Sequence, residues 1–322
     1  MRTFLFFLLL GSPILLFSQT RDTIVTVEKK VSVKVPDVVS SWQKKNSIGF
    51  DVNEIAFVNW NAGGVSSISG LLKTNFSRIY TKRNIKWGSE LIMRYGLNKQ
   101  DGIEVRKTDD AVQLNSTVGY RRDTLSNWFH SAKFTFSTQF SNGYNYPDTG
   151  NPISRAFAPA YTFLGIGAEY SNKEKKINIY LSPLTMKNTL VLDQRLADLG
   201  TFGVDKAVYD ADGNRIRRGK RSRTELGTLV STHFKATVAK NITYENRLSL
   251  YTDYLNRFGN IDTDWQGTLD LVVNEYIRAN IGFHVIYDDD IKANEEQDGK
   301  QVQVGPKIQL KQMLGIGAVY NF

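Results

Sequence analysis

Serine and histidine lie close together at two places in the sequence, and these residue types can form a nucleophile with its general base. His130 and Ser131 are adjacent, so in an extended strand their side chains point to opposite faces and cannot meet. Ser231 and His233 are two residues apart and share a face. Catalysis also needs a group that orients the histidine, and the sequence does not single one out. We therefore assign no catalytic residue.

Acidic residues cluster at two further places and offer the hard oxygen ligands that Ca²⁺ prefers. One is the motif YDADGN, with Asp210, Asp212 and Asn214, but the positions that would complete a calcium loop, 215–218, are basic or apolar. The other cluster comprises Asp288, Asp289, Asp290, Asn294, Glu295, Glu296 and Asp298. Solvated loop charge is the favoured interpretation of both, so we assign no metal ligand and no cofactor. Ca²⁺ binding by 205–214 or by 288–298 stays an open alternative.

Extended segments of alternating polarity must position these residues. From Asn46 onward apolar and polar residues alternate with a period of two, which is typical of strands with one apolar face. In the last segment Ile308, Leu314 and Phe322 lie on one side, and a strand that stays apolar to its final aromatic residue favours a wall that faces lipid. The segments are 47–58, 66–81, 84–98, 109–122, 126–141, 158–171, 175–186, 222–239, 241–255, 262–274, 276–288 and 307–322.

Connections of two lengths alternate between these segments. Short turns are expected near 82–84, 122–125, 172–174, 240 and 275, and longer loops at 99–108, 142–157, 187–221 and 289–306. Bacterial transmembrane barrels have short periplasmic turns, long extracellular loops and an even number of strands. We therefore predict an all-β fold, a transmembrane antiparallel β-barrel of about twelve strands.

Charged residues recur on the face opposite the apolar rows, with both signs in similar number. They are Glu90, Arg94, Arg121, Lys133, Glu169, Glu225, His233, Lys235, Glu245, Arg247, Asp253, Asp264, Asp270, Arg278, His284, Lys307 and Lys311. Cross-strand ion pairs are the favoured interpretation, because buried charges need partners. The alternative is a hydrated pore whose wall charges select solutes. This many charges argue against an apolar duct for hydrocarbon.

Aromatic residues gather near the expected strand ends on the apolar face. Such rings favour the headgroup level of a membrane, so we expect two girdles. The residues are Tyr80, Trp87, Tyr95, Tyr120, Trp128, Phe140, Tyr170, Tyr244, Tyr254, Trp265, Tyr287 and Tyr320.

The first residues, MRTFLFFLLLGSPILLFSQ, combine Arg2 with an apolar run, as in a secretory signal peptide cleaved near Ser18. We predict a signal peptide at 1–18, a periplasmic N-terminal extension at 19–45 and the barrel at 46–322. The chain has no cysteine, so no disulfide framework is expected. The net charge of +9 would suit nucleic acid, but an exported protein meets lipopolysaccharide instead, so we expect no nucleic-acid partner.

The longest expected loop, 187–221, contains an apolar stretch that is unlikely to stay in water: Leu190, Leu192, Leu196, Leu199 and Phe202. It either folds over or into the barrel mouth as a constriction or forms a short helix against the rim. The basic run RIRRGKRSR at 215–223 either bonds lipopolysaccharide phosphates or is a solvated loop.

Several landmarks form a set: NWNAGG at 59–64, FSNGYNYPD at 140–148, FAPAY at 157–161, LSPLT at 181–185, LADLGTFGV at 196–204 and YDDDIK at 287–292. Together they resemble an uncharacterised family of Gram-negative outer-membrane β-barrels, a domain of unknown function, over about Trp42–Phe322. The resemblance implies an outer-membrane barrel and implies no activity.

We therefore expect an exported, multi-pass protein of the Gram-negative outer membrane that is not an enzyme. The leading hypothesis is a narrow pore for small polar solutes, gated by 187–221. The alternatives are a plugged barrel with a surface-binding or structural role and, less favoured, a barrel enzyme that acts on lipid, because strand parity places Ser231 and His233 on the inner face. Expected partners are outer-membrane lipid, lipopolysaccharide and, through the C-terminal strand, the barrel-assembly machinery.

Overall fold

The computed structural model describes residues 41–56, 65–297 and 300–322. For residues 41, 293–297 and 300–303 it describes the backbone and not the side chains. The predicted signal peptide at 1–18, most of the predicted extension and the motif at 59–64 lie outside the described residues. No helix in the described part of the chain is long and apolar enough to cross a membrane.

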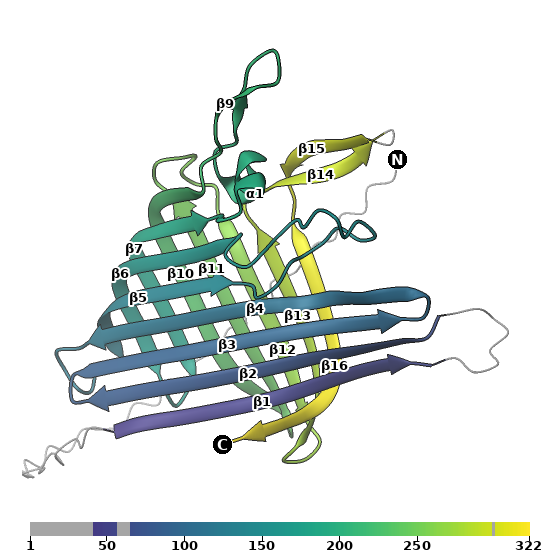
Figure 1. Ribbon diagram of the computed structural model, residues 1–322. Coiled ribbons are helices and arrows are strands. Elements are labelled where there is room, and N and C mark those ends of the chain that lie inside the picture. The colour runs from purple at the N-terminus through teal and green to yellow at the C-terminus, as the bar shows by residue number, and fades with distance from the viewer. Residues whose placement is uncertain (1–40, 57–64, 298–299) are drawn as a thin grey trace, which may run out of the picture. The chain divides into compact units, whose positions relative to one another are not determined.

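Twelve antiparallel strands close into a single ring (Figure 1). Around the ring the order is β1, β16, β13, β12, β11, β10, β7, β6, β5, β4, β3 and β2. The strands are β1 (Ser41–Ile55), β2 (Ser67–Lys82), β3 (Ile85–Gln100), β4 (Ile103–Tyr120), β5 (Trp128–Thr138), β6 (Ala160–Asn172), β7 (Ile177–Leu190), β10 (Ser222–Ala239), β11 (Ile242–Asp253), β12 (Asp262–Val272), β13 (Ile277–Tyr287) and β16 (Gln309–Asn321). Closure pairs every wall strand on both sides, so the sheet has no open edge. The predicted fold class is confirmed.

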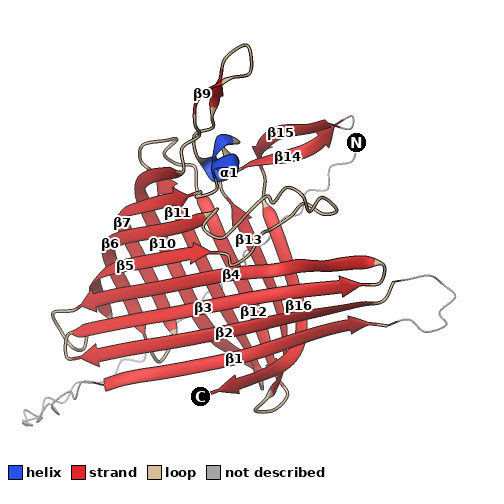
Figure 2. Cartoon of the chain, in the orientation of Figure 1, coloured by secondary structure: helices blue, strands red, loops and turns tan. Residues whose placement is uncertain are grey.

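Two of the predicted boundaries were wrong. The first strand begins at Ser41 and therefore takes in the last residues of the predicted extension. The predicted long loop at 99–108 is mostly strand, because β3 and β4 continue to a tight turn at Asp101 and Gly102. Gly102 supplies the left-handed backbone that this turn needs, with φ of 75°. In Figures 1 and 2 this hairpin extends beyond the ends of β5, β6 and β7.

The outer surface of the ring carries the apolar rows. Leu314 is 66% exposed and Trp128 51% exposed, values that a soluble fold would avoid for a whole wall. Rings gather at the end of the barrel with short turns, where Trp42 contacts Tyr80 and Trp87 with centroids 5.0 and 5.8 Å apart. We call this the turn end and the opposite one the loop end. Aromatic residues at the loop end include Tyr95, Phe140, Tyr254 and Phe258.

The closing seam joins the first and last strands. Ser47 pairs with Asn321 and Val52 with Ile316, and Asn46 and Phe322 exchange two backbone hydrogen bonds. Gly317 lets the two backbones approach, because a Cβ there would lie 2.2 Å from the carbonyl oxygen of Phe50. The last strand therefore both seals the ring and presents its apolar row outward.

A bulge at Pro183 interrupts the regular alternation in β7. The register of β7 shifts against both neighbours at this point, opposite Gly167 of β6 and Gly227 of β10. Proline lacks the N–H that a central strand donates, so an irregularity in the ladder accommodates it. The bulge reverses which residues of β7 face inward: Tyr180 and Ser182 do so before it, and Lys187 does so after it.

Replacing Gly167 with alanine is expected to destabilise the barrel strongly. A Cβ at Gly167 would lie 2.0 Å from the carbonyl oxygen of Leu181, so the backbone must move, and overpacking of this kind costs at least about 1–3 kcal/mol. Urea unfolding of the refolded protein measures the change. Gly88→Ala is the matched control, because no atom lies within 4 Å of the added Cβ. Equal unfolding free energies for the two variants would contradict the role assigned to the bulge.

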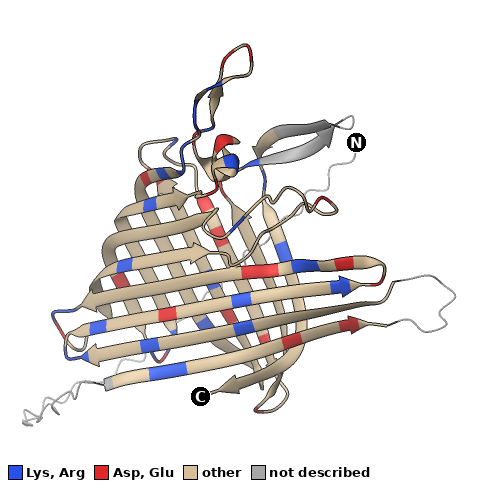
Figure 3. Ribbon diagram, viewed as in Figure 1, with Lys and Arg blue, Asp and Glu red and all other residues tan. Residues whose placement is uncertain are grey.

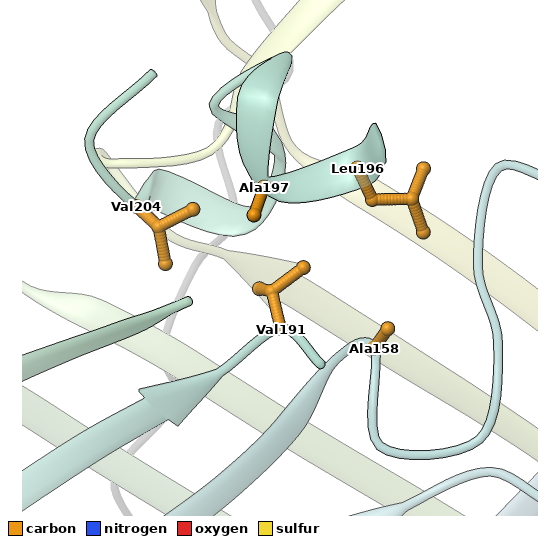
Figure 4. Close-up of a cluster of buried hydrophobic side chains, with 5 residues drawn as sticks. All are labelled: Ala158, Val191, Leu196, Ala197 and Val204. Carbon is orange, nitrogen blue, oxygen red and sulfur yellow. The ribbon is translucent and has the colours of Figure 1, made fainter. Parts of the chain in front are cut away.

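The long connection between β7 and β10, residues 191–221, forms a compact cap, which we call the cap loop. It contains α1 (Gln194–Asp198), the 3₁₀ turn η1 (Thr201–Gly203), β8 (Val208–Tyr209) and β9 (Arg215–Arg217). Its buried apolar side chains pack together on Val191 and Ala158 at the rim, as Figure 4 shows; they are Leu196, Ala197 and Val204. A second hairpin, β14 (Lys292–Gln297) and β15 (Lys300–Pro306), leaves the loop end nearby. The alternative of a short helix against the rim is therefore confirmed, although Leu192 and Leu199 stay exposed.

Candidate functional site in the barrel lumen

Inside the ring lies a cavity of about 640 Å³. Its walls come from most of the barrel strands and from Phe202 of the cap loop. Most of the residues that line it are polar or charged, although apolar atoms make up the larger part of the exposed surface (Figure 3 shows the charged residues along the strands). The acidic and basic residues that line it are Lys86, Glu90, Lys133, Glu169, Lys187, His233, Arg247, Asp262, Asp264 and Asp288. The cavity is therefore a polar lumen, as the alternation of the strands predicts.

Near the turn end, an ion pair links β3 to β6. The Lys86 ammonium lies 3.0 Å from Glu169 and 2.7 Å from the Ser171 hydroxyl. Glu169 also accepts hydrogen bonds from Asn178 and from Ser131, so the buried carboxylate is well satisfied. The Phe129 ring lies beside Lys86 and Arg121. His130, in contrast, faces outward and is exposed, so the prediction that His130 and Ser131 cannot meet is confirmed.

A second ion pair crosses the whole lumen. Arg247 of β11 donates to both carboxylate oxygens of Glu90 of β3, at 2.9 and 3.2 Å. These two strands lie six places apart in the ring of twelve, on opposite sides of the barrel. Arg247 also contacts Glu245 at 2.9 Å, and Asn75 donates to Glu90 at 2.8 Å. This bidentate pair, which we call the bar, therefore spans the barrel axis.

The Ser231 and His233 side chains share the inner face but have different partners. His233 lies 2.9 Å from Glu245, which it shares with Lys235 at 2.8 Å. The Ser231 hydroxyl instead accepts a hydrogen bond from Lys133 of β5 at 2.7 Å. No hydrogen bond joins Ser231 to His233 among the described residues, so the arrangement is not that of a nucleophile and its base.

At the loop end, one lysine holds three carboxylates. The Lys187 ammonium lies 2.6 Å from Asp262, 3.2 Å from Asp288 and 3.6 Å from Glu225. Its side chain is only 4% exposed. Asp262, Asp288 and Asp289 lie close enough together to bind a cation as a group, but the ammonium already neutralises two of them. The side chains of Asn294, Glu295, Glu296 and Asp298, the other members of the acidic cluster at 288–298, lie outside the described residues.

Replacing Lys187 with methionine is expected to lower the free energy of unfolding by about 3 kcal/mol, because it leaves buried carboxylates without their counter-charge. Added Ca²⁺ should then stabilise the variant more than the wild type, since the vacated position is surrounded by carboxylate oxygens. Urea unfolding with and without Ca²⁺ measures both effects. Lys220→Met is the control: Lys220 pairs with Asp205 at 2.7 Å but is 64% exposed, so its loss should cost less than about 1 kcal/mol. Equal losses in the two variants would contradict this account.

The cap loop is tied to its surroundings by polar contacts. Arg223 donates to the Gly203 carbonyl at 3.0 Å and pairs with Asp290 at 2.7 Å. Arg155 pairs with Asp193 at 3.0 Å on the side of the β5–β6 loop. Phe202 packs beneath the apolar cluster of the cap loop and lines the lumen cavity. The cap loop therefore closes part of the loop end of the lumen.

Asp198 organises the inside of the cap loop. Its carboxylate accepts hydrogen bonds from the Gly219 amide at 2.7 Å and Gln194 at 2.7 Å, and pairs with Arg215 at 2.6 Å. Burial alone would raise the pKa of Asp198, but these contacts hold it below its ordinary value of 3.8. A depressed pKa stabilises the fold above the ordinary value, so this contribution is lost as the pH falls below 3.8.

The acidic cluster at 210–214 is a hairpin turn. Asp210 accepts hydrogen bonds from the backbone amides of Asp212 and Asn214, at 3.1 and 2.7 Å. The carboxylate thus closes the turn between β8 and β9, as aspartate commonly does. This geometry agrees with the interpretation of solvated or hydrogen-bonded loop charge.

Most of the other predicted inner charges also have partners. Arg94 and Lys311 lie 3.3 and 2.9 Å from Asp109, and His284 lies 3.0 Å from Asp264. Asp253 accepts a hydrogen bond from the Leu255 amide at 3.0 Å. Asp270 of β12 and Arg278 of β13 lie apart from the clusters described above, and Lys307 precedes β16. Sequence reasoning missed Lys187, Asp262 and Tyr251 as lumen residues. Because the bulge at Pro183 shifts the alternation within β7, the sequence does not show that Lys187 faces inward. Tyr251 alternates in step with Arg247 on β11, so its inward direction could have been predicted.

Comparison with known protein families gives a match over part of the chain. Residues 52–144 match the family described as Protein of unknown function (DUF3078). The predicted resemblance to a family of unknown function is confirmed for this part of the chain. The DUF3078 segment runs from the end of β1 through β5 and contributes Glu90 and Lys133, whereas their partners Arg247 and Ser231 lie outside it.

Curated proteins give no match to the chain. Among solved structures, an outer membrane channel from Pseudomonas putida F1 is similar at 11% identity and a TM-score of 0.39, covering 87% of this chain and 95% of that one. The translocator domain of the autotransporter NalP from Neisseria meningitidis is similar at 10% identity and a TM-score of 0.35, covering 87% and 88%. The beta domain of the Bordetella autotransporter BrkA is similar at 10% identity and 0.32, covering 87% and 99%.

Proposed function

We propose that this protein is an integral outer-membrane barrel whose lumen is a narrow pore for small polar solutes, described here in a closed state. The observation that carries the proposal is a closed ring with apolar rows outside and a polar cavity of about 640 Å³ inside. Only a closed barrel satisfies all backbone hydrogen bonds of a sheet in lipid. A wall lined with charge gives small polar solutes a hydrated route.

Two barriers would close the pore. The Arg247–Glu90 pair crosses the lumen, and the cap loop lies over the loop end with Phe202 against the cavity. The cap loop is the part that moves, because its polar ties to the rest of the chain are few contacts such as Arg223 to the Gly203 carbonyl and Arg155 to Asp193. The wall strands are held by continuous ladders and would keep their places.

The second candidate function is a plugged barrel with a surface-binding or structural role. The same bar across the lumen favours it, since a permanently fixed pair would block the passage of solutes. In that case the exposed parts of the loop end would carry the function, including Arg217 and Arg218 of the basic run. Those guanidinium groups would bond lipopolysaccharide phosphates. Assembly of either form would use the C-terminal strand as the element that the barrel-assembly machinery engages.

Single-channel recording in planar bilayers tests the pore. Refolded protein is expected to give small, discrete conductance steps with infrequent opening. The control is the same protein heat-denatured before reconstitution, which should give none. A sealed bilayer that contains folded protein, with no conductance in any variant of the cap loop, would overturn the pore and leave the plugged barrel.

A further inference from the structure

Lys133 differs from the other lysines that line the cavity. Lys86 and Lys187 each contact a carboxylate, whereas the Lys133 ammonium donates to the Ser231 hydroxyl at 2.7 Å and forms no ion pair with a described carboxylate. Glu169, whose charge acts on Lys133, is bound to Lys86 instead. A cation that faces a cavity without a counter-ion in contact attracts an anion from solution.

An aromatic ring that belongs to a buried apolar cluster lies beside this ammonium. Its Nζ lies 5.2 Å from the centroid of the Tyr180 ring. Tyr180 packs with Leu229 and Tyr251 in a buried cluster, against which Phe163 packs, with the Phe163 and Tyr251 centroids 5.7 Å apart. This wall is unlike the charged layers at either end of the lumen. It would bury the apolar body of a ligand whose charged end reaches Lys133.

Two buried hydroxyls in this wall, those of Tyr180 and Tyr251, have no hydrogen-bond partner among the described residues, and of the two only Tyr251 lines the cavity. The Tyr251 hydroxyl is buried, and no described group forms a hydrogen bond with it. A buried hydroxyl without a partner is costly, so it marks a place where a ligand or water atom completes the hydrogen bonding. Tyr251, Lys133 and Ser231 all line the same cavity.

We infer that the lumen contains a binding site for a small organic monocarboxylate with an apolar or aromatic body. Lys133 and Ser231 bind the carboxylate, and Phe163, Leu229 and Tyr251, which line the cavity, pack on the body. A single cation matches a single negative charge. A phosphate or dicarboxylate is disfavoured, because the Lys187 charge beyond this wall is already neutralised by its three carboxylates. The inference goes beyond the pore, since binding needs an accessible lumen and not passage through it.

Benzoate is the probe for this site. Isothermal titration of benzoate into the refolded barrel in lipid nanodiscs is expected to show saturable binding. The expected loss is at least tenfold in affinity for Lys133→Met and severalfold for Ser231→Ala, because charge-assisted hydrogen bonds are the stronger ones. Benzyl alcohol, which keeps the ring without the charge, should bind at least tenfold more weakly than benzoate to the wild type. Lys220→Met, outside the lumen, should leave binding unchanged.

Several results would overturn the inference: equal benzoate affinity in the wild type and Lys133→Met, equal affinity for benzoate and benzyl alcohol, or tighter binding of inorganic phosphate than of benzoate. Absence of binding both in the wild type and in a variant whose residues 194–219 are replaced by a short glycine-serine linker would do the same. If Lys133→Met fails to fold, the comparison of the two probes on the wild type decides. Conductance is recorded separately. Binding without conductance would overturn the proposed pore and leave the proposed binding site, and conductance without binding would overturn the binding site and leave the pore.

Discussion

Replacing residues 194–219 with a short glycine-serine linker is expected to raise the conductance of the barrel several-fold. The replacement removes α1 and Phe202, which pack over the rim and line the lumen cavity. It keeps Val191 and Arg221, whose backbone hydrogen bond of 2.7 Å closes the base of the cap loop. The wall ladders do not depend on the removed residues, so the barrel should still fold. Planar-bilayer recording of wild type and variant measures the change.

The control for this experiment alters the same loop without opening the lumen. Replacing 210–214, the exposed turn between β8 and β9, with two glycines removes charged residues that project from the cap loop. Conductance should then stay at the wild-type level. An unchanged conductance in the larger replacement, with folding verified by heat-modifiable migration in gels, would mean that the cap loop is not a barrier.

The period-two alternation was sufficient to predict the wall of the barrel. Each predicted segment corresponds to one strand of the ring, because a strand between lipid and a polar lumen must alternate. The prediction failed at 99–108, where Ile103 and Val105 are the only apolar residues and the alternation is too short to indicate a strand. It also missed the inward direction of Lys187, since the bulge at Pro183 shifts parity within β7.

The pairing of charges across the lumen could not be predicted from the sequence. Parity places Glu90 and Arg247 on the inner face, but their contact depends on which strands lie opposite each other in a closed ring. The same holds for Lys133 and Ser231, which lie on strands that are not neighbours. Parity also misleads at Asn246, a polar residue on the outward face, where the Trp265 indole donates to it at 2.7 Å and covers it. The alternation within each segment therefore predicts the strands of the wall, whereas the contacts inside the lumen depend on how the ring of strands closes.

Replacing Arg247 with methionine is expected to lower the free energy of unfolding by about 2 kcal/mol, between the values of exposed and fully buried pairs. The Arg247 and Glu90 side chains are 30% and 24% exposed, because the lumen is polar. Glu90→Gln should cost less, since Arg247 keeps Glu245 at 2.9 Å. The double variant should cost less than the sum of the two, with a coupling of about 1–2 kcal/mol measured by urea unfolding.

The same variants show whether the Arg247–Glu90 pair obstructs the passage of solutes or only stabilises the wall. Removal of Arg247 takes away the cation of the bar and leaves Glu90, so both conductance and preference for cations should increase if the pair obstructs the pore. Glu90→Gln keeps the arginine in place and should shift the preference toward anions with a smaller change in conductance. The exposed Lys220–Asp205 pair provides the control cycle, whose coupling should stay below about 1 kcal/mol. Lost stability with no change in conductance or selectivity in either variant would show that the bar only braces the wall, and solutes would then need another route through the lumen.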